Sequence, residues 1–224
     1  MRHAKLNDSV RLATRQGLHA VAEQIIAGHQ YRTIGTIRLS VRPNGFTSRP
    51  LPGVPSLLAV DGTDLIVDDA RIPIAGRLGE LAAAAGVECR GPEGVYELSA
   101  DVGPTEVVTI HPGAAADLQG AWVLGDAVLR AFGSLHATGG AEPVLWPEHL
   151  DVAITVDEVN YGVSPGDAAI GEPYAYVGPH HLRTGSFWNA PWGAALPLEG
   201  VAAPALRAFF EEGRTRVATD PAAG

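Results

Sequence analysis

The sequence predicts an α+β fold: a single mixed domain with largely antiparallel hairpins and about four helices packed on the sheet. Two kinds of apolar pattern alternate along the chain, one with helical steps of three and four residues and one with the two-residue period of strands. The strand-like segments come as neighbouring pairs joined by short turns, and no regular strand–helix–strand alternation is present, which favours antiparallel pairing. The 224 residues suit one domain over residues 1–218, and residues 219–224 are expected to fray.

The first predicted helix shows how each helix is recognised. Asp8 or Ser9 can cap its first turn, because a short side-chain oxygen accepts a hydrogen bond from an otherwise unpaired backbone N–H. Apolar residues then recur at helical spacing as far as Ile25, and Gly28 is the expected stop. His19 falls on this helix and is expected to be a surface or edge residue and not a ligand. The same reasoning predicts three further helices, over residues 75–86, 112–139 and 204–216.

The strands are predicted from alternation and from turn residues. Residues 34–41 alternate with Ile37, Leu39 and Val41 on one face, and Asn44-Gly45 forms a turn into residues 46–49. A proline-rich connector covers residues 50–55, and Ser164-Pro165-Gly166-Asp167 has the residue order of a type II turn. The other predicted strands cover residues 57–60, 64–67, 71–74, 107–110, 151–157 and 174–177.

Composition and charge exclude several classes of function. The formal net charge is −9, and Lys5 is the only lysine, so a surface that follows nucleic-acid phosphates is not expected. No apolar run reaches the 18 residues of a membrane span, and the first residues lack a signal-peptide core, so we expect a soluble cytoplasmic protein without a membrane partner. A lone Cys89 rules out an internal disulfide framework.

The sequence contains no convincing motif for nucleophilic catalysis or for nucleotide binding. Residues 162–166 spell G-x-S-x-G, but Pro165 removes the backbone N–H that would form half of an oxyanion hole, and no helix is expected after it. Neither G-x-G-x-x-G nor G-x-x-x-x-G-K-[ST] occurs. The sequence therefore predicts no cofactor.

Metal ligands are also not convincingly arranged. H-E-x-x-H is absent, although Glu148, His149 and Asp151 offer potential ligands close together. His180 and His181 are adjacent, so on an extended segment their side chains point to opposite faces. The prediction is that no metal is bound.

The stretch from Leu145 to Ala195 gathers three of the four Trp and three of the five Tyr. Aromatic walls with a few polar groups are typical of small-ligand sites, and the alternative is that these rings only anchor the core. The candidate ligand-binding residues are Trp146, His149, Asp157, Asn160, Tyr161, Asp167, Glu172, Tyr174, Tyr176, Trp188, Asn189 and Trp192.

Four segments of this stretch carry a family resemblance: LWPEHLDVAI, EVNYGVSPGD, EPYAYVGP and FWNAPWGA. They resemble a family of uncharacterised actinobacterial proteins, a domain of unknown function with a W-P-x-H-F-D motif followed by an SPGD…EPY segment. Leu150 stands where that motif has Phe. The resemblance covers about the C-terminal third of the chain and implies no activity and no catalytic residues.

Three hypotheses of function remain, and the sequence leaves open whether the protein is an enzyme. The first is a protein that binds a small molecule in a pocket lined by the aromatic and carboxylate residues. The second is a cofactor-independent hydrolase or acid–base enzyme that uses His149 with Asp157, Asp167 or Glu172. The third is a homodimeric interaction module with residues 187–192 as an exposed apolar patch.

Overall fold

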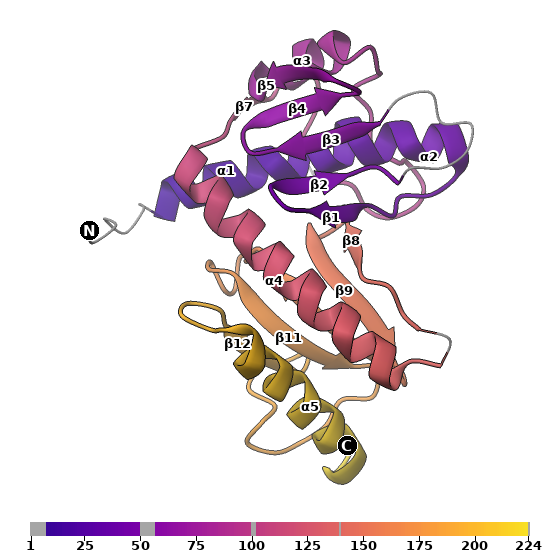
Figure 1. The fold of residues 1–224 in the computed structure, drawn as a ribbon, viewed down its shortest axis with the longest axis vertical. Helices are drawn as coiled ribbons and strands as arrows, with labels where there is room; N and C mark the ends of the chain where they lie inside the picture. The colour runs from indigo at the N-terminus through magenta and orange to yellow at the C-terminus, as the bar shows by residue number, and fades with distance from the viewer. Residues whose placement is uncertain (1–7, 50–56, 100–101, 139, 224) are drawn as a thin grey trace. The chain divides into compact units, whose positions relative to one another are not determined.

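The computed structural model describes residues 8–49, 57–99, 102–138 and 140–223, and it confirms the α+β class (Figure 1). The predicted connector at residues 50–55 lies outside the described residues. By its internal contacts the chain divides into two compact units. The first unit comprises Met1–Gly120 with Leu145–Leu150, and the second comprises Ala121–Val144 with Asp151–Gly224.

One long helix opens the first unit. It consists of α1 (Asp8–Ala20), a π-helical segment η1 (Val21–Ala27) and α2 (Gly28–Ile34), which follow one another without a break. The predicted stop at Gly28 is therefore wrong, because this glycine keeps helical torsion angles. The helix ends at Gly35, which has a φ of 74° and donates its N–H to the carbonyl of Tyr31. A glycine ends a helix with this hydrogen bond when its backbone is left-handed, and Gly35 has that conformation whereas Gly28 does not.

The remaining elements of the first unit are mostly short antiparallel strands. A five-stranded meander runs in the order β1-β2-β3-β4-β5, and β6 pairs with β7. The strand expected from residue 34 begins only at Ser40, because α2 continues to Ile34. The elements are β1 (Ser40–Arg42), β2 (Gly45–Thr47), β3 (Leu58–Asp61), β4 (Asp64–Val67), β5 (Ala70–Pro73), β6 (Ala75–Arg77), α3 (Leu78–Ala84) and β7 (Val107–Thr109).

The second unit contains the strands β12, β11, β10 and β9 of a sheet with the order β12-β11-β10-β9-β8. Helices α4, from Ala121 onward, and α5 cover one face of this sheet (Figure 1). Their close approach depends on Gly125 and Gly213, where an added Cβ would lie within 3 Å of strand side chains. The elements that lie wholly or partly in this unit are α4 (Pro112–His136), β8 (Val144–Trp146), β9 (Asp151–Val156), β10 (Val159–Ser164), β11 (Tyr174–Pro179), β12 (Ala194–Pro197) and α5 (Ala203–Thr219).

The end of the chain is tied to a loop of the second unit. We expected residues 219–224 to fray, but α5 extends to Thr219 and the backbone beyond it makes hydrogen bonds. Thr184 donates its N–H to Pro221, and Ala223 donates its N–H to Leu182, at 2.9 and 2.8 Å. None of the helices in the described ranges has both the length and the apolarity that a bilayer span requires.

Candidate functional site

Strand alternation sorts the candidate residues of the second unit onto two faces of the sheet. Tyr161 points to the face that the helices cover and is only 1% exposed. Its ring lies 4.7 Å from that of Phe132 and 5.9 Å from that of Phe210, measured between centroids. Burial raises the pKa of its hydroxyl. Tyr161 therefore belongs to the core between sheet and helices.

A tyrosine–carboxylate pair lies on the opposite face. Tyr176 of β11 lies over Gly162 of β10, where an added Cβ would come within 2.4 Å of the tyrosine ring and hydroxyl. The Tyr176 hydroxyl donates a short hydrogen bond to Asp151 at the start of β9, and Asp151 is only 6% exposed. Burial and the negative charge of Asp151 raise the pKa of Tyr176 well above its ordinary value. The hydroxyl thus keeps its proton and donates a hydrogen bond to the buried carboxylate.

A second pair forms beside the first one. Tyr174 donates its hydroxyl to Asp167 at 2.6 Å, and Asp167 also accepts the backbone N–H groups of Ala169 and Ile170 at 2.7 and 2.8 Å. Burial and this hydrogen bond raise the pKa of Tyr174. In the preceding turn Gly166 has a φ of 99°, the left-handed value that a type II turn needs at its third residue. Asp167 is therefore a turn-forming residue as well as the partner of Tyr174.

Trp192 completes the group. Its ring stacks on Tyr174 at 5.9 Å and meets Tyr176 edge-on at 6.1 Å. The Asn189 side chain holds the Trp192 loop, since it donates to the Ala195 carbonyl at 3.0 Å and accepts the Ala195 N–H at 2.8 Å. We call Asp151, Asp167, Tyr174, Tyr176 and Trp192 the Tyr–Asp cluster; of these, Asp151 was not among the candidates from the sequence.

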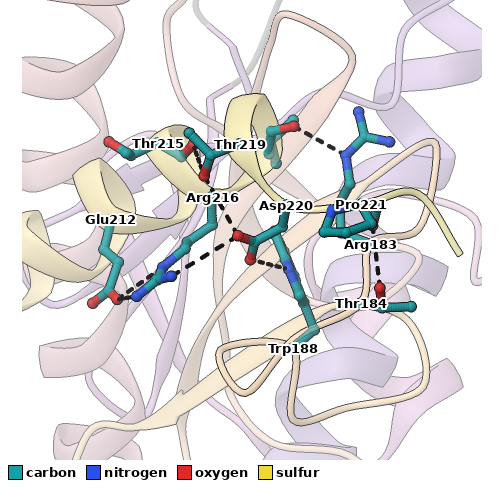
Figure 2. A network of polar contacts seen from close by, with 10 residues as sticks. Arg183, Thr184, Trp188, Glu212, Thr215, Arg216, Thr219, Asp220 and Pro221 are labelled. Carbon is teal, nitrogen blue, oxygen red and sulfur yellow. Dashed lines mark hydrogen bonds and ion pairs between the residues drawn. The ribbon is translucent and has the colours of Figure 1, made fainter.

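Trp188 has a different role, in the network that Figure 2 shows. Its indole N–H donates to Asp220 at 3.0 Å, and Asp220 also lies 3.8 Å from the guanidinium of Arg216. The neighbouring Phe187 packs against Phe209 of α5, with centroids 5.5 Å apart. Residues 187 and 188 are thus half-buried and anchor the end of the chain.

Three polar candidates lie outside the Tyr–Asp cluster. Asp157 lies in the turn between β9 and β10, is 70% exposed, and pairs with Arg214 at 3.7 Å. Asn160 accepts a hydrogen bond from Thr155 at 2.7 Å. Glu172 is half-buried in the loop before β11.

Trp146 and His149 belong to the first unit. The guanidinium of Arg38 lies 5.5 Å above the Trp146 ring, in a cation–π contact. The His149 side chain is 72% exposed and lies 3.7 Å from its neighbour Glu148. The carboxylates that the sequence suggested as its partners (Asp157, Asp167 and Glu172) belong to the other unit.

The first unit holds a buried polar group that sequence reasoning missed. Glu23 is 1% exposed and accepts the Gln24 amide at 3.0 Å and the Ser99 N–H at 3.3 Å. Burial and the charge of Glu23 raise the pKa of Tyr96, whose buried hydroxyl completes no hydrogen bond of ordinary geometry to a described residue. We call His19, Glu23, Gln24, Tyr96 and Ser99 the Glu23 cluster. The adjacent polar residues Glu23 and Gln24 within an apolar helix were the available signal.

His19 lies one helical turn before Glu23. Its Nε2 is 2.7 Å from the carbonyl oxygen of Pro147. Because a carbonyl only accepts, Nε2 carries the proton and Nδ1 is the basic nitrogen when the ring is neutral. Burial lowers the pKa of His19, and the charge of Glu23 opposes this shift. His19, which is half-buried, is therefore a neutral imidazole near neutral pH.

The search for metal ligands and for relatives gave no assignment. Across the described ranges, no group of three or more His, Cys, Asp or Glu side chains lies so that it could hold a metal ion. Comparison with protein-family models, with curated proteins and with solved structures found no significant match to this chain.

Proposed function

We propose that the chain binds a small molecule at the Tyr–Asp cluster of its second unit. The observation that carries this proposal is the stacking of the half-exposed Trp192 ring on the buried Tyr174 ring. A rigid aromatic surface beside a few fixed polar groups is how proteins recognise small ligands. The cluster lies on the face of the sheet opposite to α4 and α5, so the helices do not cover it.

The chemistry of the cluster indicates which part of a ligand each group would bind. The outer face of Trp192 suits a flat apolar ring or chain of the ligand. The Tyr174 and Tyr176 hydroxyls already donate to carboxylates, so a ligand that reaches them would have to donate a hydrogen bond to a remaining lone pair. We therefore expect a ligand that combines an apolar face with hydrogen-bond donors.

Ligand screening by thermal shift and tryptophan fluorescence tests this proposal. A ligand at the cluster is expected to raise the melting temperature and to change the emission of Trp192. Trp192→Ala should remove both responses, and Trp146→Phe, which alters an indole of the first unit, should keep the stabilisation. A broad metabolite panel without any response, or a response that survives in Trp192→Ala, would contradict the proposal.

An acid–base function at His149 has weaker support from the same structure. With 72% of its side chain exposed, His149 lacks the desolvated surroundings that tune a catalytic base. Its partner within 4 Å among the described residues is Glu148, which is itself 42% exposed. His19 is the better placed imidazole of the first unit, because burial and a backbone carbonyl fix its neutral tautomer.

A further inference from the structure

The loop between β11 and β12, residues 180–193 and here called the lid, carries Trp192 over the Tyr–Asp cluster. The Trp192 ring stacks on the buried Tyr174 ring, with 5.9 Å between the centroids. The lid joins two strands that pair with each other, so its two ends lie close together. A compact surface loop of this length with neighbouring ends is an Ω-loop, an element that often carries function.

The last part of the lid fixes the position of Trp192. Ala190 and Gly193 exchange two backbone hydrogen bonds, at 3.0 and 3.1 Å. Pro191 and Trp192 are therefore the two tip residues of a tight hairpin turn. The Asn189 side chain holds this turn to β12 through its two hydrogen bonds with the strand backbone. Trp192 is displaced from the cluster only when the whole turn moves.

The first part of the lid is fastened to the residues that follow α5, as Figure 2 shows. Thr184 donates its N–H to the carbonyl of Pro221 at 2.9 Å. Trp188 donates its indole N–H to the Asp220 carboxylate at 3.0 Å. That carboxylate lies 3.8 Å from the guanidinium of Arg216, so it is itself held to α5. The contact between Trp188 and Asp220 thus ties the lid to the end of this helix.

Burial contributes less to the lid than to the sheet beside it. From residue 180 to residue 192 every residue is exposed or half-buried, although Phe187 contacts Phe209 of α5. In β10, by contrast, every residue except Asn160 is buried. Segments with few buried apolar contacts open at a lower free energy than the core does. The lid is therefore the part of this region that opens first.

We propose that the lid opens as one unit and that the contact between Trp188 and Asp220 is its latch. In the closed lid Trp192 covers one face of Tyr174, and opening uncovers that ring. Opening also breaks the hydrogen bonds of Asn189 and leaves the pairing of β11 with β12 in place. The lid controls access to the Tyr–Asp cluster, so its role rests on the function proposed for that cluster.

Hydrogen exchange of the full chain, followed by mass spectrometry, tests the lid and its latch. Asp220→Ala removes the acceptor of the Trp188 indole. Amides of residues 184–193 should then exchange roughly tenfold faster or more, the loss expected for a hydrogen bond to a charged group. Acceleration at Ala190 and Gly193, whose backbone bonds are to each other, shows that the lid moves as one unit. Peptides from β9 and β10 serve as the internal reference.

A matched variant shares the partner of Asp220 but not its contact with the lid. Glu212 pairs with the same Arg216, at 3.2 Å, so Glu212→Ala should leave lid exchange at the wild-type rate. Wild-type exchange at Ala190 and Gly193 in folded Asp220→Ala would overturn the proposal. If Asp220→Ala does not fold, Trp188→Phe removes the same hydrogen bond from the other side, and the same outcome decides. A wild-type lid that exchanges as slowly as β10 would also overturn it.

Hydroxyl-radical footprinting measures what the lid does to the cluster. Oxidation of Tyr174 should increase in Asp220→Ala, whereas Tyr161, buried on the helix-covered face, should stay at its wild-type level. Unchanged oxidation of Tyr174 despite faster lid exchange would overturn the control of access. None of these measurements needs a ligand. A lid that behaves as expected, together with a metabolite panel that gives no response, would contradict the proposed function alone.

Discussion

The two clusters solve the same problem, a buried carboxylate, in different ways. Asp151 lies at the start of a strand and receives the hydroxyl of a tyrosine two strands away. Glu23 lies within a helix and receives a side-chain amide and a backbone N–H from a loop. In the sheet, the strand register places the Tyr176 hydroxyl next to Asp151. In the helix, Glu23 lies in the π-helical segment and accepts the Ser99 N–H from outside the helix. The hydroxyl donor of Asp151 comes from a strand of the same sheet, whereas the backbone donor of Glu23 comes from a loop 76 residues further along the chain.

The largest loss of stability is expected at Gly28, where the helix packs against the backbone of Arg90. Gly28→Ala places a methyl group 1.9 Å from the Arg90 carbonyl oxygen, so the backbone at Arg90 must move, and we expect about 3 kcal/mol of destabilisation. Urea denaturation measures this change. Gly120→Ala is the matched control, because it is also a helical glycine but has nothing within 4 Å of the added Cβ. It should stabilise by roughly 0.5–1 kcal/mol, and equal effects of the two substitutions would refute the close approach.

The next effect separates the two tyrosines of the sheet. Tyr176→Phe removes a hydroxyl donor from Asp151, which is only 6% exposed, and should lower the free energy of unfolding by about 2 kcal/mol. Tyr174→Phe should cost less, about 1 kcal/mol, because Asp167 is only half-buried and keeps two backbone N–H donors. Chemical denaturation of both variants checks the order. A larger loss for Tyr174→Phe would show that Asp151 does not depend on Tyr176.

A smaller effect is expected at Gly162, because there the neighbour is a side chain. Gly162→Ala brings a methyl group to within 2.4 Å of the Tyr176 ring, which can shift, so we expect about 1 kcal/mol of destabilisation. In a Tyr176→Leu background the penalty should largely disappear. A double-mutant cycle measures this coupling, and additive effects would contradict the contact.

The smallest effect concerns pH and His19. Burial lowers the pKa of His19 in the folded protein below its ordinary value of 6.5, so the unfolded chain binds this proton more readily. The free energy of unfolding should therefore decrease as the pH falls below about 6.5, and above that value His19 contributes no pH dependence. Urea titrations at pH 8 and pH 5.5 measure this change, and His19→Gln should reduce it. An NMR titration of His19 with a raised pKa would reverse the sign and contradict the prediction.

Sheet patterning was the most predictable part of the fold. The alternation at 151–157 and 174–177 anticipated β9 and β11, and with them the common face of Tyr174 and Tyr176. The strand β10 between them was not predicted, because Gly162 and the turn at Ser164-Pro165 hide its alternation. Asp151 was overlooked for a related reason, since its partner Tyr176 is determined by register across three strands and not by spacing along the chain.

The Glu23 cluster could not be anticipated from helical periodicity. A regular helix places Glu23 on the face away from the apolar stripe, whereas the π-helical segment is buried on every side from Ala20 to Gly28. The loop of residues 90–99 that contacts it has no periodic pattern, so nothing in the sequence connects Tyr96 or Ser99 with the helix. These hydrogen bonds join residues that are 67 and 76 positions apart in the sequence, so they depend on the tertiary fold.

The π-helical segment also affects how the chain tolerates changes in its length. Each residue turns a regular helix by about 100°, so removal of one residue between Val21 and Ala27 would rotate everything before it relative to everything after it. Such a deletion would allow an unbroken α-helix. The Gln24 carbonyl, which accepts the Arg90 N–H at 2.9 Å, would then form a hydrogen bond within the helix and lose this contact. The π-helical segment therefore acts as one extra residue in the helix, and its presence leaves the Gln24 carbonyl to accept the N–H of Arg90.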